Sequence, residues 1–177
     1  MFSHQRAFFR RISPVRLRST ELPSPFAWIR PQKLAIGGFP DDPAHWGALE
    51  VQGLRAVFSC CDPSEGHWSP PAHWVRRLCP LPDHRQPHSL SAAHLLAAIG
   101  EATALVKDGQ PLYLHCRAGI ERSPLLAIAL QCTAWGMDLF EALSWVKRQH
   151  PEARPLTDQL LLLEALQADG FLWPQAA

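Results

Sequence analysis

Short apolar runs alternate along the chain with longer segments in which apolar residues recur every three or four positions. Runs of the first kind are typical of buried strands, and they occupy residues 26–29, 33–36, 54–60, 74–81 and 112–115. The longer spacing predicts helices at about 43–52, 92–107, 124–135, 139–149 and 158–169. Strands separated by helices predict an α/β fold, with a mixed, largely parallel sheet of about five strands and helices on both faces.

Two features of this pattern locate helix ends and loops. We expect Asp41 or Asp42 to cap the helix that starts near Pro43, and Thr157 to cap the last helix. Residues 61–73 form a polar, proline-rich connection. A connection of that length in a compact domain is either functional or mobile.

The length of 177 residues suits one domain, and a composition of 47% hydrophobic and 19% charged residues is ordinary for a globular protein with a sizeable core. We place this domain at residues 23–177. Residues 1–22 carry five arginines and no acidic residue before Glu21, which predicts a basic, flexible arm. Organelle-import leaders have a similar composition. We expect a cytoplasmic protein, with organelle targeting through this arm as the alternative.

Charge and cysteine usage exclude several classes of protein. The formal net charge of +1 provides no long-range attraction to nucleic acid, so we expect no nucleic-acid partner. No apolar stretch reaches the ~20 residues that a membrane span requires. Five cysteines without a CxxC pair argue against a disulfide framework and a structural zinc site. We therefore expect a reducing compartment. We also expect no metal, no cofactor and, among the oligomeric states that the sequence leaves open, a monomer.

The candidate chemistry lies in the segment His-Cys-Arg-Ala-Gly-Ile-Glu-Arg-Ser at residues 115–123. It follows an apolar run and precedes a long aliphatic segment, which is typical of a strand, a tight loop and a helix. Backbone N–H groups at such a helix N-terminus converge and bind an anion. Positive potential there favours the nucleophilic thiolate of Cys116, and the guanidinium of Arg122 can bind two phosphoryl oxygens. We interpret the segment as a phosphate site with its own nucleophile.

Cleavage of a phosphate monoester also needs a proton for the departing alcohol. Asp83 is the best candidate for this acid, because it follows a strand and stands in a proline-rich turn 33 residues before Cys116. The helix between them would bring the two strands parallel, and ligands of such sheets lie beyond the carboxyl ends of the strands. We therefore expect Asp83 and Cys116 to meet at one edge of the sheet.

These residues carry a resemblance to a known family. HCRAGIERS is similar to the signature of the cysteine-dependent protein tyrosine phosphatase superfamily, which is His-Cys, five residues, then Arg and Ser or Thr. The size of the chain resembles the dual-specificity branch. Further similarities are found at Leu34–Gly38, Gly53–Phe58, Leu81–Asp83 and Arg154–Pro155. The resemblance covers most of the chain and implies the dual-specificity phosphatase fold.

The resemblance assigns catalytic roles to five residues. It implies that Cys116 attacks phosphorus and forms a phosphocysteine, that Arg122 binds the phosphate, and that Asp83 acts first as acid and then as base. Ser123 would donate a hydrogen bond to the departing thiolate. His115 would orient the loop and favour the thiolate form. No metal is implied.

The resemblance further implies that the loop backbone and one guanidinium bind the phosphate, through Arg117, Ala118, Gly119, Ile120, Glu121 and Arg122. Glu121 stands where the family usually has Gly or Ser, and its carboxylate could repel a dianion or disfavour the thiolate. Arg117 could offset this charge, and both side chains could instead face solvent. Gln159 could position the hydrolytic water, or it could lie on a solvated helix face.

The expected function is a phosphatase that acts on phosphotyrosine and phosphoserine or phosphothreonine in proteins through a phosphocysteine intermediate. Tyr113 is the only tyrosine, so the tyrosine-rich loop that deepens the pocket of tyrosine-specific enzymes is missing and a shallow pocket is implied. His84 and Arg85, beside the acid, are candidates for substrate contact. Two alternatives stay open: a phosphatase for a non-protein phosphoester such as a phosphoinositide, and a catalytically weak phosphate-binding module.

Overall fold

The computed structural model describes residues 21–85 and 90–172, so the predicted arm at 1–22 lies outside the described residues except for Glu21 and Leu22. The centre of the protein is a five-stranded sheet in the order β1-β2-β5-β3-β4. The first strand is antiparallel to its neighbour, whereas the other four are parallel to one another. The strands are β1 Phe26–Arg30, β2 Leu34–Gly37, β3 Ala56–Ser59, β4 Val75–Leu78 and β5 Leu112–His115. The expected mixed, largely parallel α/β sheet is confirmed.

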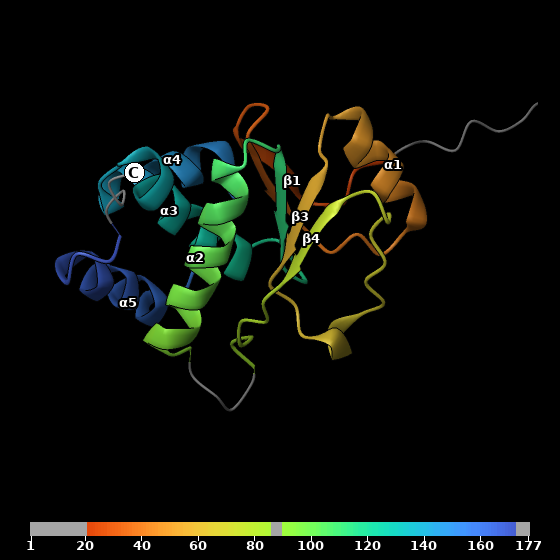
Figure 1. The fold of residues 1–177 in the computed structure, drawn as a ribbon. Helices are drawn as coiled ribbons and strands as arrows, with labels where there is room; N and C mark the ends of the chain where they lie inside the picture. The colour runs from red at the N-terminus through yellow and green to blue at the C-terminus, as the bar shows by residue number, and fades with distance from the viewer. Residues whose placement is uncertain (1–20, 86–89, 173–177) are drawn as a thin grey trace, which may run out of the picture.

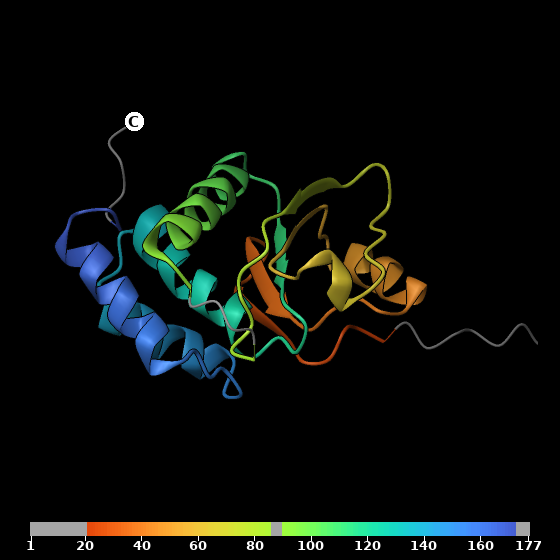
Figure 2. The same cartoon turned by 90° about the horizontal axis from the view of Figure 1, so that it is seen from below.

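Helices cover both faces of the sheet, with α1 on one face and α2 to α5 on the other (Figure 1). They are α1 Pro43–Val51, α2 Ala92–Lys107, α3 Arg122–Trp135, α4 Leu139–Gln149 and α5 Thr157–Ala168. Figure 2 shows from below the same arrangement, with α1 on one face of the sheet and α2 to α5 on the other. Each face has its own apolar cluster: Leu114 belongs to the large cluster beneath α2 to α5, and Tyr113 to the smaller one beneath α1. Tyr113 and Leu114 belong to different clusters because successive residues of a strand point to opposite faces of the sheet.

Local sequence determines where the helices begin. Asp42 caps α1, as expected, and accepts a hydrogen bond from the backbone N–H of Ala44 at 2.7 Å. The prediction that Thr157 caps α5 is wrong, because Thr157 is already the first helical residue. The side chain of Gln159 instead accepts the N–H of Leu156, the residue at the cap, at 3.0 Å.

The central strand β5 ends where two neighbouring strands end. Its last residue, His115, pairs with Gly37 of β2 and with Ser59 of β3. The carboxyl ends of three parallel strands therefore form one edge of the sheet, which is where ligands of such folds bind. At one side of the sheet, β4 is an edge strand whose four residues are all exposed, including Arg76 and Arg77.

The loop that follows β5 leads directly into α3. This helix begins at Arg122, two residues before the expected start, and every residue from Arg122 to Thr133 is buried. The loop therefore joins the central strand to a helix inside the core, so it has a rigid support on both sides. Within the two described ranges, no helix combines the length and the apolar composition needed to cross a membrane.

Candidate active site

We call residues Cys116–Arg122 the phosphate loop; they comprise the loop between β5 and α3 and the first residue of α3. Neighbouring segments hold this loop through hydrogen bonds to its carbonyl groups. Three of its carbonyls accept hydrogen bonds from neighbouring segments: Arg117 from the N–H of Phe39 at 3.2 Å, Gly119 from Nε2 of His150 at 2.9 Å, and Ile120 from the N–H of Arg154. The N–H of a trans peptide points away from its C=O. The N–H groups of Ala118, Ile120 and Glu121 therefore point toward the inside of the loop, where the sequence predicts the phosphate.

Gly119 allows the phosphate loop to pack against the end of β2. Its φ of 72° lies in the left-handed region that favours glycine. A Cβ atom on this residue would lie 2.6 Å from the nitrogen of Gly38 and closer still to the carbonyl carbon of Gly37. Because both neighbours are backbone atoms, they cannot move aside by a rotamer change, and this position requires glycine.

Cys116 and Ser123 face each other at the start of α3. Cys116 Sγ and Ser123 Oγ are 3.3 Å apart, and both residues are buried. The hydroxyl is therefore placed to donate to a thiolate, which is the role that the resemblance implies. Burial raises the pKa of Cys60 well above its ordinary value and that of Cys61 to about 12, so these neighbouring thiols stay protonated.

Arg122, which is 2% exposed, carries the positive charge of the site. Its Nη1 and Nη2 donate to the two carboxylate oxygens of Glu65 at 2.6 and 2.7 Å. Nη1 also donates to the carbonyls of Cys60 and Leu81, and Nη2 donates to Oδ2 of Asp83 at 3.3 Å. Burial would lower the pKa of Arg122, but Glu65 reverses the shift and raises it. The guanidinium is therefore charged although it is buried.

Glu65 is a site residue that the sequence analysis does not identify. It ends a short 3-10 helix, Pro63–Glu65, inside the connection 61–73, and Asp62 caps that turn. The turn directs Glu65 over the phosphate loop, where its side chain is 14% exposed. Burial opposes ionisation, but hydrogen bonds from Arg122 and from the backbone of Asp62 lower the pKa of Glu65. The capping-box pattern Asp-x-x-Glu is the signal that could have located this turn.

Asp83 lies where the sequence places the acid, facing the phosphate loop. Its carboxylate accepts hydrogen bonds from Nε of Arg85 at 2.8 Å and from Nη2 of Arg122 at 3.3 Å. The bond from Arg85, together with the charge of Arg122, lowers the pKa of Asp83 to about 2. The carboxyl group is therefore ionised in this arrangement. Arg85, a candidate for substrate contact, binds the acid itself.

His115 is fully buried beneath the phosphate loop. Its ring is stacked against Tyr113 with centroids 5.8 Å apart, and it meets Phe39 edge to face at 5.4 Å. Burial lowers the pKa of His115 to about 3, so the imidazole is neutral. The ring can pack against the loop and orient it. It has no positive charge with which to favour a thiolate at Cys116, so that part of its predicted role lacks an electrostatic basis.

Glu121 does not face solvent, contrary to one of the two expectations for its side chain. It is 8% exposed, and its carboxylate accepts hydrogen bonds from Nδ1 of His84 at 2.6 Å and from Nε2 of Gln159 at 2.9 Å. Gln159 is also buried, so its interpretation as a residue of a solvated helix face is wrong. Arg117, by contrast, is exposed and lies over the ring of Phe39 at 5.2 Å.

Asp83, His84 and Glu121 form the one group of possible metal ligands within residues 21–85 and 90–172, with donor atoms within 4.8 Å of one another. Carboxylate and imidazole donors suit a divalent cation such as Zn²⁺. Each of these groups also has a hydrogen-bond or ion-pair partner in the protein. The expectation that the site needs no metal stays a prediction.

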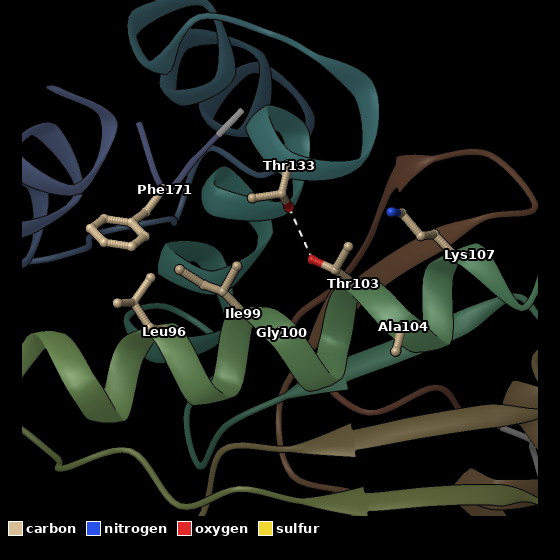
Figure 3. A pocket seen from close by; sticks show the side chains of 8 residues that line it. All are labelled: Leu96, Ile99, Gly100, Thr103, Ala104, Lys107, Thr133 and Phe171. Atoms are coloured by element: carbon tan, nitrogen blue, oxygen red, sulfur yellow. Dashed lines mark hydrogen bonds between the residues drawn. The ribbon is translucent and has the colours of Figure 1, made fainter. Parts of the chain in front are cut away.

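A separate cavity of about 320 Å³ opens between α2, α3 and the segment after α5 (Figure 3). Its wall contains a hydrogen bond of 3.0 Å between Thr103 and Thr133, with Lys107 toward one end and Phe171 toward the other (Figure 3). Among the described residues that line it, there is no cysteine and no carboxylate. The cavity therefore lacks the combination of thiol, arginine and carboxyl group that the phosphate loop has, and the phosphate loop is the candidate active site.

Comparisons with known proteins find relatives among dual specificity phosphatases, although no family model matches the chain. Mouse (Mus musculus) dual specificity protein phosphatase 14 is 27% identical over 112 residues, which is 63% of this chain and 54% of the relative. The match thus spans about half the length of that curated relative. A solved mouse putative dual specificity phosphatase has a TM-score of 0.66 and 26% identity, over 87% of this chain and 95% of that one. The structure of PTPMT1 in complex with PI(5)P has a TM-score of 0.69 and 16% identity, over 81% and 95%, and shows the fold alone.

Proposed function

We propose that this chain, a member of the cysteine-dependent protein tyrosine phosphatase superfamily and of its dual-specificity branch, hydrolyses phosphate monoesters through a phosphocysteine intermediate. One observation carries the proposal: Cys116, Arg122 and Asp83 converge at the carboxyl edge of the sheet. Arg122 contacts Asp83 at 3.3 Å, and the phosphate loop that contains Arg122 begins with Cys116. A nucleophile, a phosphate-binding cation and a carboxyl group are the parts that this reaction requires.

The first step transfers the phosphoryl group to the cysteine. The thiolate of Cys116 attacks phosphorus opposite the ester oxygen, so that an S–P bond forms while the P–O bond to the alcohol breaks. The inward N–H groups of the phosphate loop and the guanidinium of Arg122 stabilise the negative charge on the three equatorial oxygens. Asp83 donates its proton to the departing alcohol oxygen.

Asp83 must carry a proton for this step, although its pKa is about 2 in the described arrangement. A phosphate dianion changes its surroundings in two ways. The dianion competes for Nη2 of Arg122, whose contact with Asp83 at 3.3 Å is longer than its contact with Glu65 at 2.7 Å. It also brings negative charge close to the carboxyl group. Both changes raise the pKa of Asp83 and favour the protonated acid.

The second step hydrolyses the phosphocysteine. Asp83, now ionised, takes a proton from a water molecule as the water attacks phosphorus, and the S–P bond breaks. Ser123 Oγ, which lies 3.3 Å from the sulfur, donates a hydrogen bond to the thiolate that leaves. Inorganic phosphate is released, and Cys116 returns to its starting state.

The proposed substrates are phosphotyrosine and phosphoserine or phosphothreonine in proteins. Tyr113 is fully buried and does not deepen the entrance, which supports a shallow, less selective pocket. A cavity of about 240 Å³ lies at the rim, between Glu65, Arg117 and Trp46. Exposed Arg117 favours a second candidate, a phosphoester with further negative charge such as a phosphoinositide. A cytoplasmic location and a monomeric state stay predictions.

Hydrolysis of phenyl phosphate by three variants tests the proposal. Cys116→Ser should abolish turnover, and Asp83→Asn should lower kcat by about 100-fold or more, because general acid–base catalysis contributes about 10²–10⁴-fold. Cys79→Ser is the matched control at a half-buried thiol outside the site, and it should leave turnover unchanged. Turnover that survives Cys116→Ser would contradict the mechanism. An inactive wild type that binds phosphate would favour the phosphate-binding module. Comparing turnover of phosphopeptides with turnover of phosphoinositides would identify the substrate class.

A further inference from the structure

Glu121 precedes Arg122 in the phosphate loop and connects this loop to two other segments. A carboxylate that is 8% exposed is costly to bury unless hydrogen bonds compensate for the lost hydration. Both of its oxygens have such bonds, each from a different part of the chain. Oε2 accepts from His84, in the loop 81–85 that contains the acid, and Oε1 accepts from Gln159 in the first turn of α5.

These bonds form a continuous path from α5 to the acid. Oε1 of Gln159 accepts the N–H of Leu156 at 3.0 Å, which fixes the amide so that its Nε2 points at Glu121. Glu121 in turn accepts from Nδ1 of His84 at 2.6 Å. His84 is the residue next to Asp83, and the same Nδ1 lies 3.5 Å from Oδ1 of Asp83. The position of the acid is therefore coupled to the phosphate loop through Glu121.

Two of the contacts of Asp83 cannot provide this coupling during the reaction. Arg85 lies in the same loop as Asp83 and moves with it. Arg122 is the group that the phosphate engages, so its contact with Asp83 weakens when the substrate binds. The contact between Glu121 and His84 joins the two loops without using Arg122, the cation that engages the phosphate in the proposed mechanism.

We infer that Glu121, oriented by Gln159, is a positioning residue that holds Asp83 over the phosphate loop through His84. The acid is thereby kept within reach of the oxygen that leaves the phosphorus. This inference rests on the proposed phosphatase function. It assigns the carboxylate of Glu121 a role in acid catalysis, in place of the repulsion of substrate that its charge alone predicts.

The test compares kcat/KM for two substrates that differ in their need for an acid. Phenyl phosphate releases phenolate, a poor leaving group that requires a proton, whereas 2,4-dinitrophenyl phosphate releases 2,4-dinitrophenolate, a stable anion that leaves without one. Glu121→Ala and His84→Ala should each lower kcat/KM for phenyl phosphate by about tenfold, a part of the ~10²–10⁴-fold that a general acid contributes. For the dinitrophenyl ester the change should be less than about threefold.

Three further variants separate positioning from a general loss of structure. Glu121→Gln keeps an oxygen that can accept from His84, so it should recover part of the loss. His73→Ala removes another exposed histidine that pairs with a carboxylate, at 2.6 Å from Glu50. It should leave kcat/KM unchanged for both substrates. In an Asp83→Asn background, Glu121→Ala should have no additional effect on phenyl phosphate, because there is no acid left to position.

The outcomes distinguish this inference from the proposed function. Equal losses on the two substrates, or an undiminished loss in the Asp83→Asn background, would overturn the positioning role and leave the phosphatase mechanism standing. Turnover that does not depend on Cys116 would overturn the mechanism itself. Circular dichroism establishes that each variant is folded. If Glu121→Ala does not fold, Glu121→Gln and His84→Ala carry the test, because the His84 side chain is 49% exposed.

Discussion

Replacing Glu65 by glutamine should destabilise the protein, because the change removes the charge that faces a buried guanidinium. Glu65 makes two charge-assisted hydrogen bonds to Arg122, at 2.6 and 2.7 Å, and the arginine side chain is 2% exposed. Glutamine keeps the shape and one acceptor oxygen, but it places an NH₂ group against one of the arginine N–H groups. Arg122 then keeps Asp83 and two backbone carbonyls as its acceptors.

The magnitude follows from these contacts. Removing one partner of a buried ion pair costs about 3–5 kcal/mol, and a hydrogen bond to a charged group contributes about 1.5–3 kcal/mol. The acceptors that Arg122 keeps reduce the loss, as does the 14% exposure of the Glu65 side chain, which lets solvent screen the pair. We expect Glu65→Gln to lower the free energy of unfolding by about 2–3 kcal/mol. In a domain of this size, that corresponds to a decrease in Tm of about 4–12 °C.

Urea unfolding followed by circular dichroism measures this difference. Glu50→Gln is the matched control, because Glu50 also pairs with an arginine, Arg55 at 3.6 Å, but at the surface, where an ion pair contributes little. The reasoning is refuted if the two variants unfold at the same urea concentration, or if Glu65→Gln leaves the wild-type midpoint unchanged.

The two carboxylates that contact Arg122, Glu65 and Asp83, predict how stability depends on pH. Folding lowers the pKa of Glu65 below its ordinary value and lowers that of Asp83 to about 2. A group whose pKa is lower in the folded state contributes stability that is present above its ordinary pKa and is lost as the pH falls through the folded pKa. The free energy of unfolding of the wild type should therefore decrease from about pH 5 to about pH 2. Glu65→Gln should show a smaller decrease over the same range.

Three further outcomes concern the phosphate loop and its support. The ring of His115 should keep the NMR shifts of a neutral imidazole from about pH 8 to about pH 5, because burial lowers its pKa to about 3; a titration near the ordinary value of about 6.5 would contradict this. Gly119→Ala should unfold or inactivate the protein, since its Cβ meets backbone atoms, whereas Gly100→Ala, at a helical position with open space around it, should raise the free energy of unfolding by about 0.5–1 kcal/mol. Indistinguishable melting curves for these two variants would be the contrary result. Ser123→Ala should slow the breakdown of the phosphocysteine more than its formation, and rapid-quench kinetics should show a larger burst of released alcohol; a burst equal to that of the wild type would argue against the hydrogen bond to Cys116.

Features with short-range signals could be predicted from the sequence. The helix α2 and the strand β5 occupy the predicted residues, 92–107 and 112–115, because Ser91 caps the helix and an Asp-Gly pair ends it. The proposed nucleophile, Cys116, and the proposed phosphate-binding residue, Arg122, lie in one contiguous segment, so the motif identifies both candidates. The place of Asp83 follows from topology, since the carboxyl ends of parallel strands meet at one edge.

Contacts between loops could not be predicted in the same way. Glu65 and Arg122 are 57 positions apart, and no periodicity relates them. Their pairing depends on how the connection 61–73 folds back over the sheet, which is a tertiary property. The sequence likewise shows the charge of Glu121 but not its two hydrogen-bond donors, which come from another loop and from α5. From the sequence alone, Glu121 is therefore only a departure from the usual residue types of the motif, and its hydrogen-bond partners become known from the structure.

The exposed edge strand β4 bears on how the protein behaves in concentrated solution. If a second copy of the chain paired with this edge through its own β4, its Arg76 and Arg77 would lie close to Arg76 and Arg77 of the first copy. Repulsion between the four guanidinium groups disfavours such pairing, which unprotected edge strands permit. Salt shortens the range of this repulsion from about 10 Å at 0.1 M to about 3 Å at 1 M. Light scattering should therefore show stronger self-association as the ionic strength rises. The two arginines of the edge strand thus limit the salt concentrations at which the molecules stay dispersed.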